Sequence, residues 1–380
     1  MPTLPQTFDA ADFLGQLARH PGPVLSGVVG PALRGLLQDL GRPIGLDPGP
    51  VTYNVVVAAL CFAAMAGFVT LTALGLTLAE RKVAAFFQNR KGPNRVGFWG
   101  LLQPIADVLK LLQKEDTVPR AADRPVFLLA PFVGMIATYM VLAVIPFDQG
   151  LSVTDLNVGV LYITAVSSLG VLSILMAGWS SANKYSLLGG LRSAAQIVSY
   201  ELSPALVVLS VALFAGTLSV QGIVESQASG WNLWRLGPTG WLAMLIYLTA
   251  GTAEINRAPF DLPEAESELT AGYHTEYSGM RFSMFQLAEF MNMFIIAALC
   301  ATLFLGGWQA LGPLRALGIP GYLWFGGKTT LVMFVIMWFR WTFPRVRVDQ
   351  LMKLEWKILL PLSFLNLIVV ALWAAAGFGK

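Results

Sequence analysis

Long, continuously apolar segments recur along the chain from about residue 54 to residue 376, and polar stretches separate them. Most are about 18 to 25 residues long, the length that a helix needs to cross the roughly 30 Å hydrocarbon layer of a bilayer. Because the segments do not alternate apolar and polar residues, they predict helices rather than a β-barrel. We predict eight membrane spans, at about 54–79, 127–146, 159–178, 193–218, 237–253, 288–306, 326–343 and 359–376.

The loop between the first two spans has a helical periodicity of its own. Between Phe98 and Leu112, apolar residues recur at intervals of three and four, whereas Gln103 and Asp107 lie off this stripe. The spacing predicts an amphipathic helix along the membrane interface, with Pro104 in its first turn. Two roles stay open for this helix: a surface anchor, or a functional lid or gate.

Composition supports a membrane protein. Of the 380 residues, 56% are hydrophobic and 12% are charged, against about a quarter charged in soluble domains. The predicted fold is all-α: a polytopic membrane bundle of about eight transmembrane helices with one amphipathic helix on the cytoplasmic side. Residues 51–380 are expected to form a single transmembrane domain with loops at about 80–126 and 254–287, preceded by a Pro- and Gly-rich segment, 1–50, on the periplasmic side.

Lysine and arginine gather in the loops of one side of the predicted bundle. The loops of the other side carry only Arg235, Arg315 and Lys328. By the positive-inside rule the basic side is cytoplasmic, so both termini are expected on the opposite side. A net charge of +3 with scattered basic residues does not indicate a nucleic-acid partner.

Most motifs of catalysis and metal binding are missing from the sequence. It contains no GxGxxG after a strand, no Walker A motif, no HExxH and no cysteine cluster. Cys61 and Cys300 stand alone in apolar segments, which indicates inert small side chains. His20 and His274 are the only histidines, so no metal site is predicted, and His274 is interpreted as a polar loop residue or hydrogen-bond donor.

Charges in or beside the apolar segments are the remaining candidates, because a charge in the membrane is costly and usually functional. Glu80, Arg81 and Lys82 end the first span, which fits either a cluster that stops the helix or a functional site. Glu201 lies inside the fourth span, shortly before Pro204. Because Pro204 frees a backbone carbonyl one turn earlier, a proton-relay role for Glu201 is favoured over simple structural pairing.

The densest group of carboxylates lies in the stretch GTAEINRAPFDLPEAESELTAGYHTEY, residues 251–277. A solvated acidic loop is one explanation. However, Pro259 and Pro263 stiffen the stretch and apolar residues interleave with the acids, so the loop is expected to fold back into a cavity. Carboxylates crowded in a cavity share protons. The charged residues here are Glu254, Arg257, Asp261, Glu264, Glu266, Glu268 and Glu276, followed by Glu289 at the start of the sixth span.

Several of these segments, in the same order, resemble the complex I subunit 1 family, which includes the H subunit of bacterial NADH:quinone oxidoreductase. They are ERK at 80–82, RKGPN at 90–94, GLLQPIAD at 100–107, SYE at 199–201, AEINRAPFDL at 253–262 and EAESEL at 264–269. The resemblance covers about residues 50–380. It implies a subunit in a bacterial inner membrane that couples quinone reduction by NADH to proton translocation.

The resemblance also implies roles for single residues. In this family the subunit encloses most of the quinone chamber, with ubiquinone or menaquinone as substrate, while FMN and Fe–S clusters belong to partner subunits. Those partners are quinone-proximal subunits of the peripheral arm and small and antiporter-like membrane subunits. The implied roles are quinone binding for Arg81, Asp107, Arg257 and Asp261, a responsive loop with Glu264, Glu266 and Glu268, and a buried acidic path through Glu201, Glu254, Glu276 and Glu289.

Three other assignments stay open. A homologous membrane subunit of a hydrogenase or formate-type complex would lack a true quinone site, and the motifs around residues 90–107 favour the quinone enzyme over it. An ion-coupled transporter would predict two related halves, and no internal repeat is visible. A structural anchor for a peripheral arm would leave Glu201 unexplained.

Overall fold

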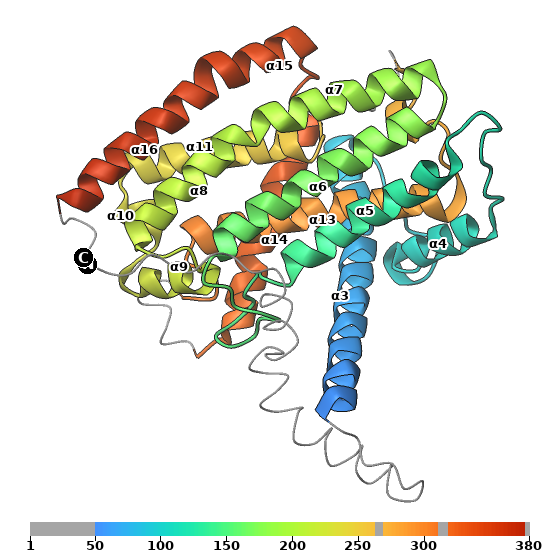
Figure 1. Ribbon diagram of the computed structural model, residues 1–380. Coiled ribbons are helices and arrows are strands. Elements are labelled where there is room, and N and C mark those ends of the chain that lie inside the picture. Colours follow the sequence, from blue (N-terminus) through green and yellow to red (C-terminus); the bar gives the residue numbers. More distant parts are fainter. Residues whose placement is uncertain (1–49, 263–268, 311–317, 377–380) are drawn as a thin grey trace, which may run out of the picture.

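The computed structural model describes residues 50–262, 269–310 and 318–376, with side chains described from residue 59 onward. Within these ranges the regular structure is helical and no strand occurs (Figure 1). The prediction of an all-α membrane bundle is confirmed. Nearly all of the predicted N-terminal segment lies outside the described residues.

Each predicted span corresponds to a helical segment of the structure. Seven segments among the described residues are long and apolar enough to cross a membrane, and the eighth, α11, has 17 residues. The segments are α3 (Pro50–Phe87), α5 (Arg124–Leu142), α6 (Gly159–Ser180), α7 (Lys184–Tyr200) with α8 (Leu202–Ala215), α11 (Pro238–Glu254), α13 (Gly279–Phe304), α14 (Gly321–Thr342), and α15 (Val348–Leu354) with the π-helical turn η7 (Glu355–Leu359) and α16 (Leu360–Ala375).

Shorter helices lie in the connections between these segments. The first loop contains η3 (Phe98–Gly100) and α4 (Gln103–Gln113), and η5 (Gly272–His274) lies in the loop before α13. The connection between α8 and α11 contains α9 (Val220–Ser226), η4 (Gln227–Ser229) and α10 (Asn232–Arg235).

Several helices extend beyond the predicted ends of the spans. α3 continues to Phe87, α13 begins at Gly279, and the fourth segment begins at Lys184 and is interrupted at Glu201. Two of the predicted ends, at residues 79 and 193, lie directly beside the charged residues Glu80 and Arg192. In the structure, Glu80 stays inside α3, where it contacts Arg257 within the bundle.

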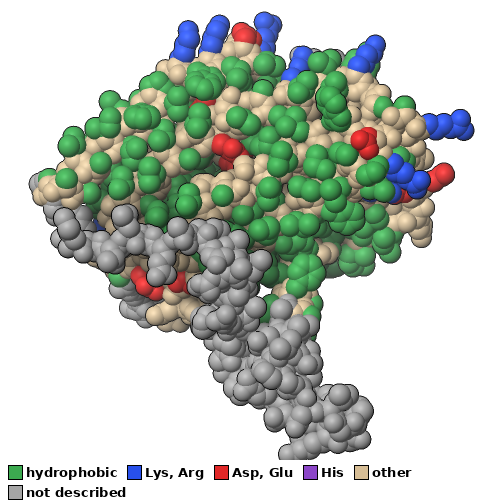
Figure 2. All heavy atoms as spheres, in the orientation of Figure 1, with side chains coloured by type: hydrophobic (Ala, Val, Ile, Leu, Met, Phe, Trp, Pro, Cys, Tyr) green, Lys and Arg blue, Asp and Glu red, His purple; other side chains and the backbone are tan. Residues whose placement is uncertain are grey.

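α13 is the centre of the bundle. It packs against α3, α5, α11 and α14, and it is the most deeply buried of the long helices. Hydrophobic side chains cover most of the flank seen in Figure 2, whereas lysine and arginine side chains project from one edge. That distribution fits a bundle with a lipid-facing belt and one basic face.

The predicted amphipathic helix is present but shorter than its apolar pattern. α4 begins at Gln103 with Pro104 in its first turn, as expected, and the preceding residues form η3 instead. Gly100 ends η3 with φ of +78°, and a Cβ atom there would lie 2.2 Å from the backbone oxygen of Pro93. This close approach separates η3 from α4 and requires glycine.

Gly100→Ala is expected to destabilise this turn, because alanine is strained at that φ and its methyl group would overlap the Pro93 oxygen. Positions of this kind cost about 1–3 kcal/mol. The measurement is the thermal midpoint of the purified protein. Gly75→Ala in α3 is the matched control, since a Cβ there meets nothing within 4 Å. A midpoint for Gly100→Ala at or above that of the control would contradict this packing.

Candidate functional site

A cavity of about 420 Å³ lies among α5, α6, α7, α8, α11 and α13 and is open on one side, where the lining residues Val198 and Leu202 are exposed. Three carboxylates of the predicted acidic path line it from different elements: Glu201 at the α7–α8 junction, Glu254 at the end of α11, and Glu289 on α13. Most other lining residues are apolar. Apolar walls make every isolated charge in this cavity costly.

Amide and hydroxyl groups complete the polar part of the wall. Thr138 donates a hydrogen bond of 3.3 Å to Oδ1 of Asn292, and Asn256 donates one of 3.1 Å to Ser193. Oε1 of Glu201 is buried and has no hydrogen-bond partner among the described residues. The volume is sufficient for several water molecules, so carboxylates, hydroxyls and water could together conduct protons across this space.

The segment after α11 is held against α7. Nε2 of Gln196 donates to the backbone oxygens of Ala253 and Phe260, at 2.8 Å each. The apolar residues Phe260, Leu262 and Leu269 are buried, so the chain packs into the bundle on both sides of 263–268. The predicted loop residues Glu264, Glu266 and Glu268 lie outside the described residues.

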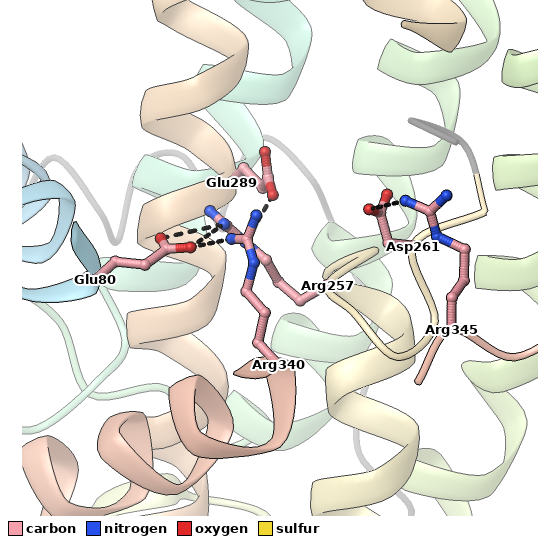
Figure 3. A network of polar contacts seen from close by, with 6 residues as sticks. All are labelled: Glu80, Arg257, Asp261, Glu289, Arg340 and Arg345. Carbon is pink, nitrogen blue, oxygen red and sulfur yellow. Dashed lines mark hydrogen bonds and ion pairs between the residues drawn. The ribbon is translucent and has the colours of Figure 1, made fainter. Parts of the chain in front are cut away.

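Arg257 is the centre of a buried ionic cluster (Figure 3). Its Nη1 donates to both carboxylate oxygens of Glu80, at 3.1 and 3.2 Å, and its Nε lies 2.7 Å from Oε1 of Glu289. Arg340 of α14 donates to the same Glu80 carboxylate. Arg257 also lies over the Phe290 ring, 4.6 Å from its centre. Since the side chains of Arg257 and Glu80 are only 7% and 8% exposed, each charge depends on its partners.

Glu289 joins this cluster to the cavity. It pairs with Arg257 and it also lines the cavity that Glu201 and Glu254 share. An ion pair in a poorly solvated site responds strongly to a nearby change of charge. Glu289 is therefore the residue that the ionic cluster and the cavity share.

The other predicted quinone-binding residues form two separate ion pairs. Arg81 on α3 lies 2.5 Å from Asp107 on α4, which also accepts a hydrogen bond from Gln103. Asp261 lies 2.9 Å from Arg345, beyond the end of α14, and Figure 3 shows this pair apart from the Arg257 cluster. Neither pair lines the cavity.

Glu276 lies outside the cavity lining as well. Its Oε1 accepts a hydrogen bond of 2.7 Å from Asn183, the residue that caps α7. The nearby His274 is in a loop, as expected, but it is buried against the rings of Tyr273 and Phe285. Burial raises the pKa of Tyr277 to about 12, and its hydroxyl donates to the backbone oxygen of Phe127 at 3.1 Å.

Three important charged residues were missed or misplaced by the sequence analysis. Neither Arg340 nor Glu355 was singled out. Lys328 was counted with loop residues, but it lies in α14, is 8% exposed and donates to three backbone oxygens. The available signal was position: each of these charges lies in or directly beside an apolar segment.

The chain matches a known protein family over most of its length. The model of the family described as NADH dehydrogenase matches residues 59–371. A protein of Bacteroides thetaiotaomicron, named as the H subunit of NADH-quinone oxidoreductase, is 50% identical over 85% of this chain and 91% of its own length. Proteins with the same name from Geobacillus kaustophilus and Anoxybacillus flavithermus are 52% and 53% identical, over 83% and 80% of this chain and 92% and 89% of their own lengths.

Proposed function

The chain belongs to the NADH dehydrogenase family, as a relative of the H subunit of NADH-quinone oxidoreductase, and on this premise we propose that it forms the quinone-binding chamber and couples quinone reduction to proton translocation. The chain is thus a multi-pass membrane subunit of an enzyme complex. The substrate is a quinone, and either ubiquinone or menaquinone meets the chemistry proposed below. The observation that carries the proposal is the double role of Glu289, in an ion pair with Arg257 and in the wall of the cavity.

Reduction of a quinone to a quinol takes up two electrons and two protons. In the proposed mechanism, the change of charge at the quinone headgroup acts on the segment that contains Arg257 and Asp261. Arg257 then shifts its interaction between Glu80 and Glu289, the two carboxylates that it contacts. Weaker pairing with Arg257 favours the protonated form of Glu289, and stronger pairing favours the ionised form.

Glu289 exchanges its proton across the cavity with Glu254 and Glu201. The three carboxylates line one space, so one proton can occupy any of them in turn. Glu264, Glu266 and Glu268 are proposed to respond to the quinone in the loop that follows Asp261, and Glu276 to extend the path beyond the cavity. No single catalytic base is required for this relay.

The membrane entrance of the chamber is proposed to lie at α3 and α4. The Arg81–Asp107 pair links the two helices, and the exposed apolar side chains of Leu101, Leu102 and Ile105 offer a surface for an isoprenoid tail. This arrangement supports a role of the amphipathic helix in quinone access in addition to anchoring.

Other complex I subunits are the partners of this chain. We propose that peripheral-arm subunits with FMN and Fe–S clusters deliver the electrons, and that small and antiporter-like membrane subunits receive the coupling signal. The bilayer is proposed to be the bacterial inner membrane, with the basic face in the cytoplasm and both termini in the periplasm.

The substitutions Glu201→Gln and Glu268→Gln test the proposal. Both are expected to allow normal assembly and to reduce inhibitor-sensitive NADH:quinone turnover or proton pumping by roughly tenfold or more, since each removes a protonatable group. Glu225→Gln is the matched control, because the Glu225 side chain is exposed on α9 and bonds only to Gln221 in the described part of the chain. Full activity and full pumping in both test variants would exclude the relay. Co-purification with a nickel hydrogenase, without NADH activity, would assign the chain to a related complex instead.

A further inference from the structure

Glu355 is a buried carboxylate to which the proposed function gives no role. It begins the π-helical turn η7 between α15 and α16 and is 1% exposed. Ser203 donates a hydrogen bond to Oε1, whereas Oε2 is buried and has no hydrogen-bond partner among the described residues. No ion pair described for the chain includes Glu355.

Burial of a carboxylate with a single hydroxyl donor is costly, and an apolar residue of similar size would serve packing better. A π-helical turn is a rare departure from α-helical geometry that occurs often at functional sites. The two features coincide at Glu355. Together they indicate a functional carboxylate rather than a packing residue.

The contacts of η7 and α15 lead directly to the α7–α8 junction. The Tyr200 hydroxyl donates to the backbone oxygen of Leu351 at 2.9 Å, one turn before Glu355, and Ser203 bonds Glu355 itself. Glu201 lies between Tyr200 and Ser203 in the sequence, and it lines the cavity instead. The helix is interrupted at Glu201. On the two sides of this interruption, Tyr200 is bonded to α15 and Ser203 is bonded to η7.

We propose that Glu355 is a positioning residue of the proton path, whose protonation state sets the position of Glu201 through Ser203. This inference rests on the proposed role of Glu201. Ionised Glu355 accepts the Ser203 hydroxyl in a charge-assisted bond, and uptake of one proton converts the carboxylate to the neutral acid and removes that assistance. Release of the same proton restores the bond. The first turn of α8 therefore takes a different position in each protonation state of Glu355, and Glu201 moves with it.

The elements packed against η7 carry the other groups that titrate near Glu355. η7 packs against α7, α11, α15 and α16. The titratable residues of these elements are Lys184, Tyr185, Arg192 and Tyr200 on α7, Tyr247 and Glu254 on α11, and Asp349 and Lys353 on α15, with none on α16, and η7 itself carries Lys357. Of these, Tyr200 bonds α15 and Glu254 lines the cavity with Glu201.

The test compares Glu355→Gln, Ser203→Ala and the double variant in the assembled complex, with Glu225→Gln as control. The readout is NADH:quinone turnover between pH 6 and pH 9. Each single variant is expected to lower turnover roughly three- to tenfold, the equivalent of one hydrogen bond, and to move the midpoint of the pH profile. The double variant is expected to lose no more than the larger single effect, because both substitutions remove the same contact.

A purely structural role would lower stability and leave the pH midpoint unchanged, and that result would overturn the inference. If Glu355→Gln does not assemble, the inference is tested with Ser203→Ala alone. A parental pH profile of turnover in Ser203→Ala would also overturn the inference. Glu201→Gln is measured in the same series. If Glu201→Gln has reduced turnover and Glu355→Gln keeps the parental pH profile, the role of Glu355 is refuted and the proposed function stays intact. Parental turnover and pumping in Glu201→Gln would refute the proposed function itself.

Discussion

Arg257→Gln is expected to destabilise the protein by about 3–5 kcal/mol, the cost of removing one partner from a buried ion pair. The substitution removes the cation that lies between Glu80 and Glu289, and glutamine cannot neutralise either carboxylate. The expected result is a lower thermal midpoint of the purified complex and less assembled complex in the membrane. Lys353→Gln is the control, because Lys353 is 66% exposed and its Nζ lies 4.0 Å from Oδ2 of Asp349, in an exposed and therefore weak ion pair.

A second substitution distinguishes lost charge from lost packing at Arg257. Glu289→Gln in the Arg257→Gln background removes a carboxylate that has lost its cation, so the double variant should be more stable than the sum of the two single losses predicts. Strict additivity, or a midpoint for Arg257→Gln equal to that of Lys353→Gln, would show that the cluster does not depend on Arg257.

Lys328→Met is expected to cost about 3 kcal/mol or more, because three backbone oxygens lose a buried donor together. Nζ of Lys328 donates at 2.6, 2.8 and 2.6 Å to the oxygens of Leu305, Gly307 and Gln309, and it lies 4.6 Å from the Trp231 ring centre. Methionine keeps most of the length and apolar volume of the side chain, so the loss reports on the ammonium group. The thermal midpoint of the purified complex is the measurement.

The control for Lys328→Met is Lys353→Met, which removes an exposed ammonium from α15. It should change the thermal midpoint little. Equal midpoints for the two methionine variants would mean that the ammonium of Lys328 does not hold the end of α13 to α14.

The apolar pattern was sufficient to predict the fold class and the approximate position of every span. It failed at the ends of the spans, because it treats each charge as a surface marker. Glu80 and Arg340 are 260 residues apart in the sequence and bond each other inside the bundle. A pairing over that separation depends on how α3 and α14 pack against each other. The apolar periodicity of a single helix gives no information on that packing.

The carboxylates of the site were recognised one by one, but their arrangement was not predictable. Glu201, Glu254 and Glu289 share one cavity because α7, α11 and α13 meet there. Glu276, which was grouped with them, bonds Asn183 instead. Glu355 escaped notice because it lies among Lys353, Trp356 and Lys357 and resembles a solvated interfacial charge, whereas the π-helical turn that accompanies its burial is visible only in the structure.

The most direct test of the central claim is the number of protons translocated per electron by the complex reconstituted in sealed vesicles, measured for the parent, Glu201→Gln and Glu225→Gln. The relay predicts fewer protons per electron in Glu201→Gln, even if electron transfer in this variant is slower than in the parent. It predicts the parental ratio in Glu225→Gln. A parental ratio in Glu201→Gln at full turnover would contradict the claim that the cavity carboxylates couple quinone reduction to proton translocation.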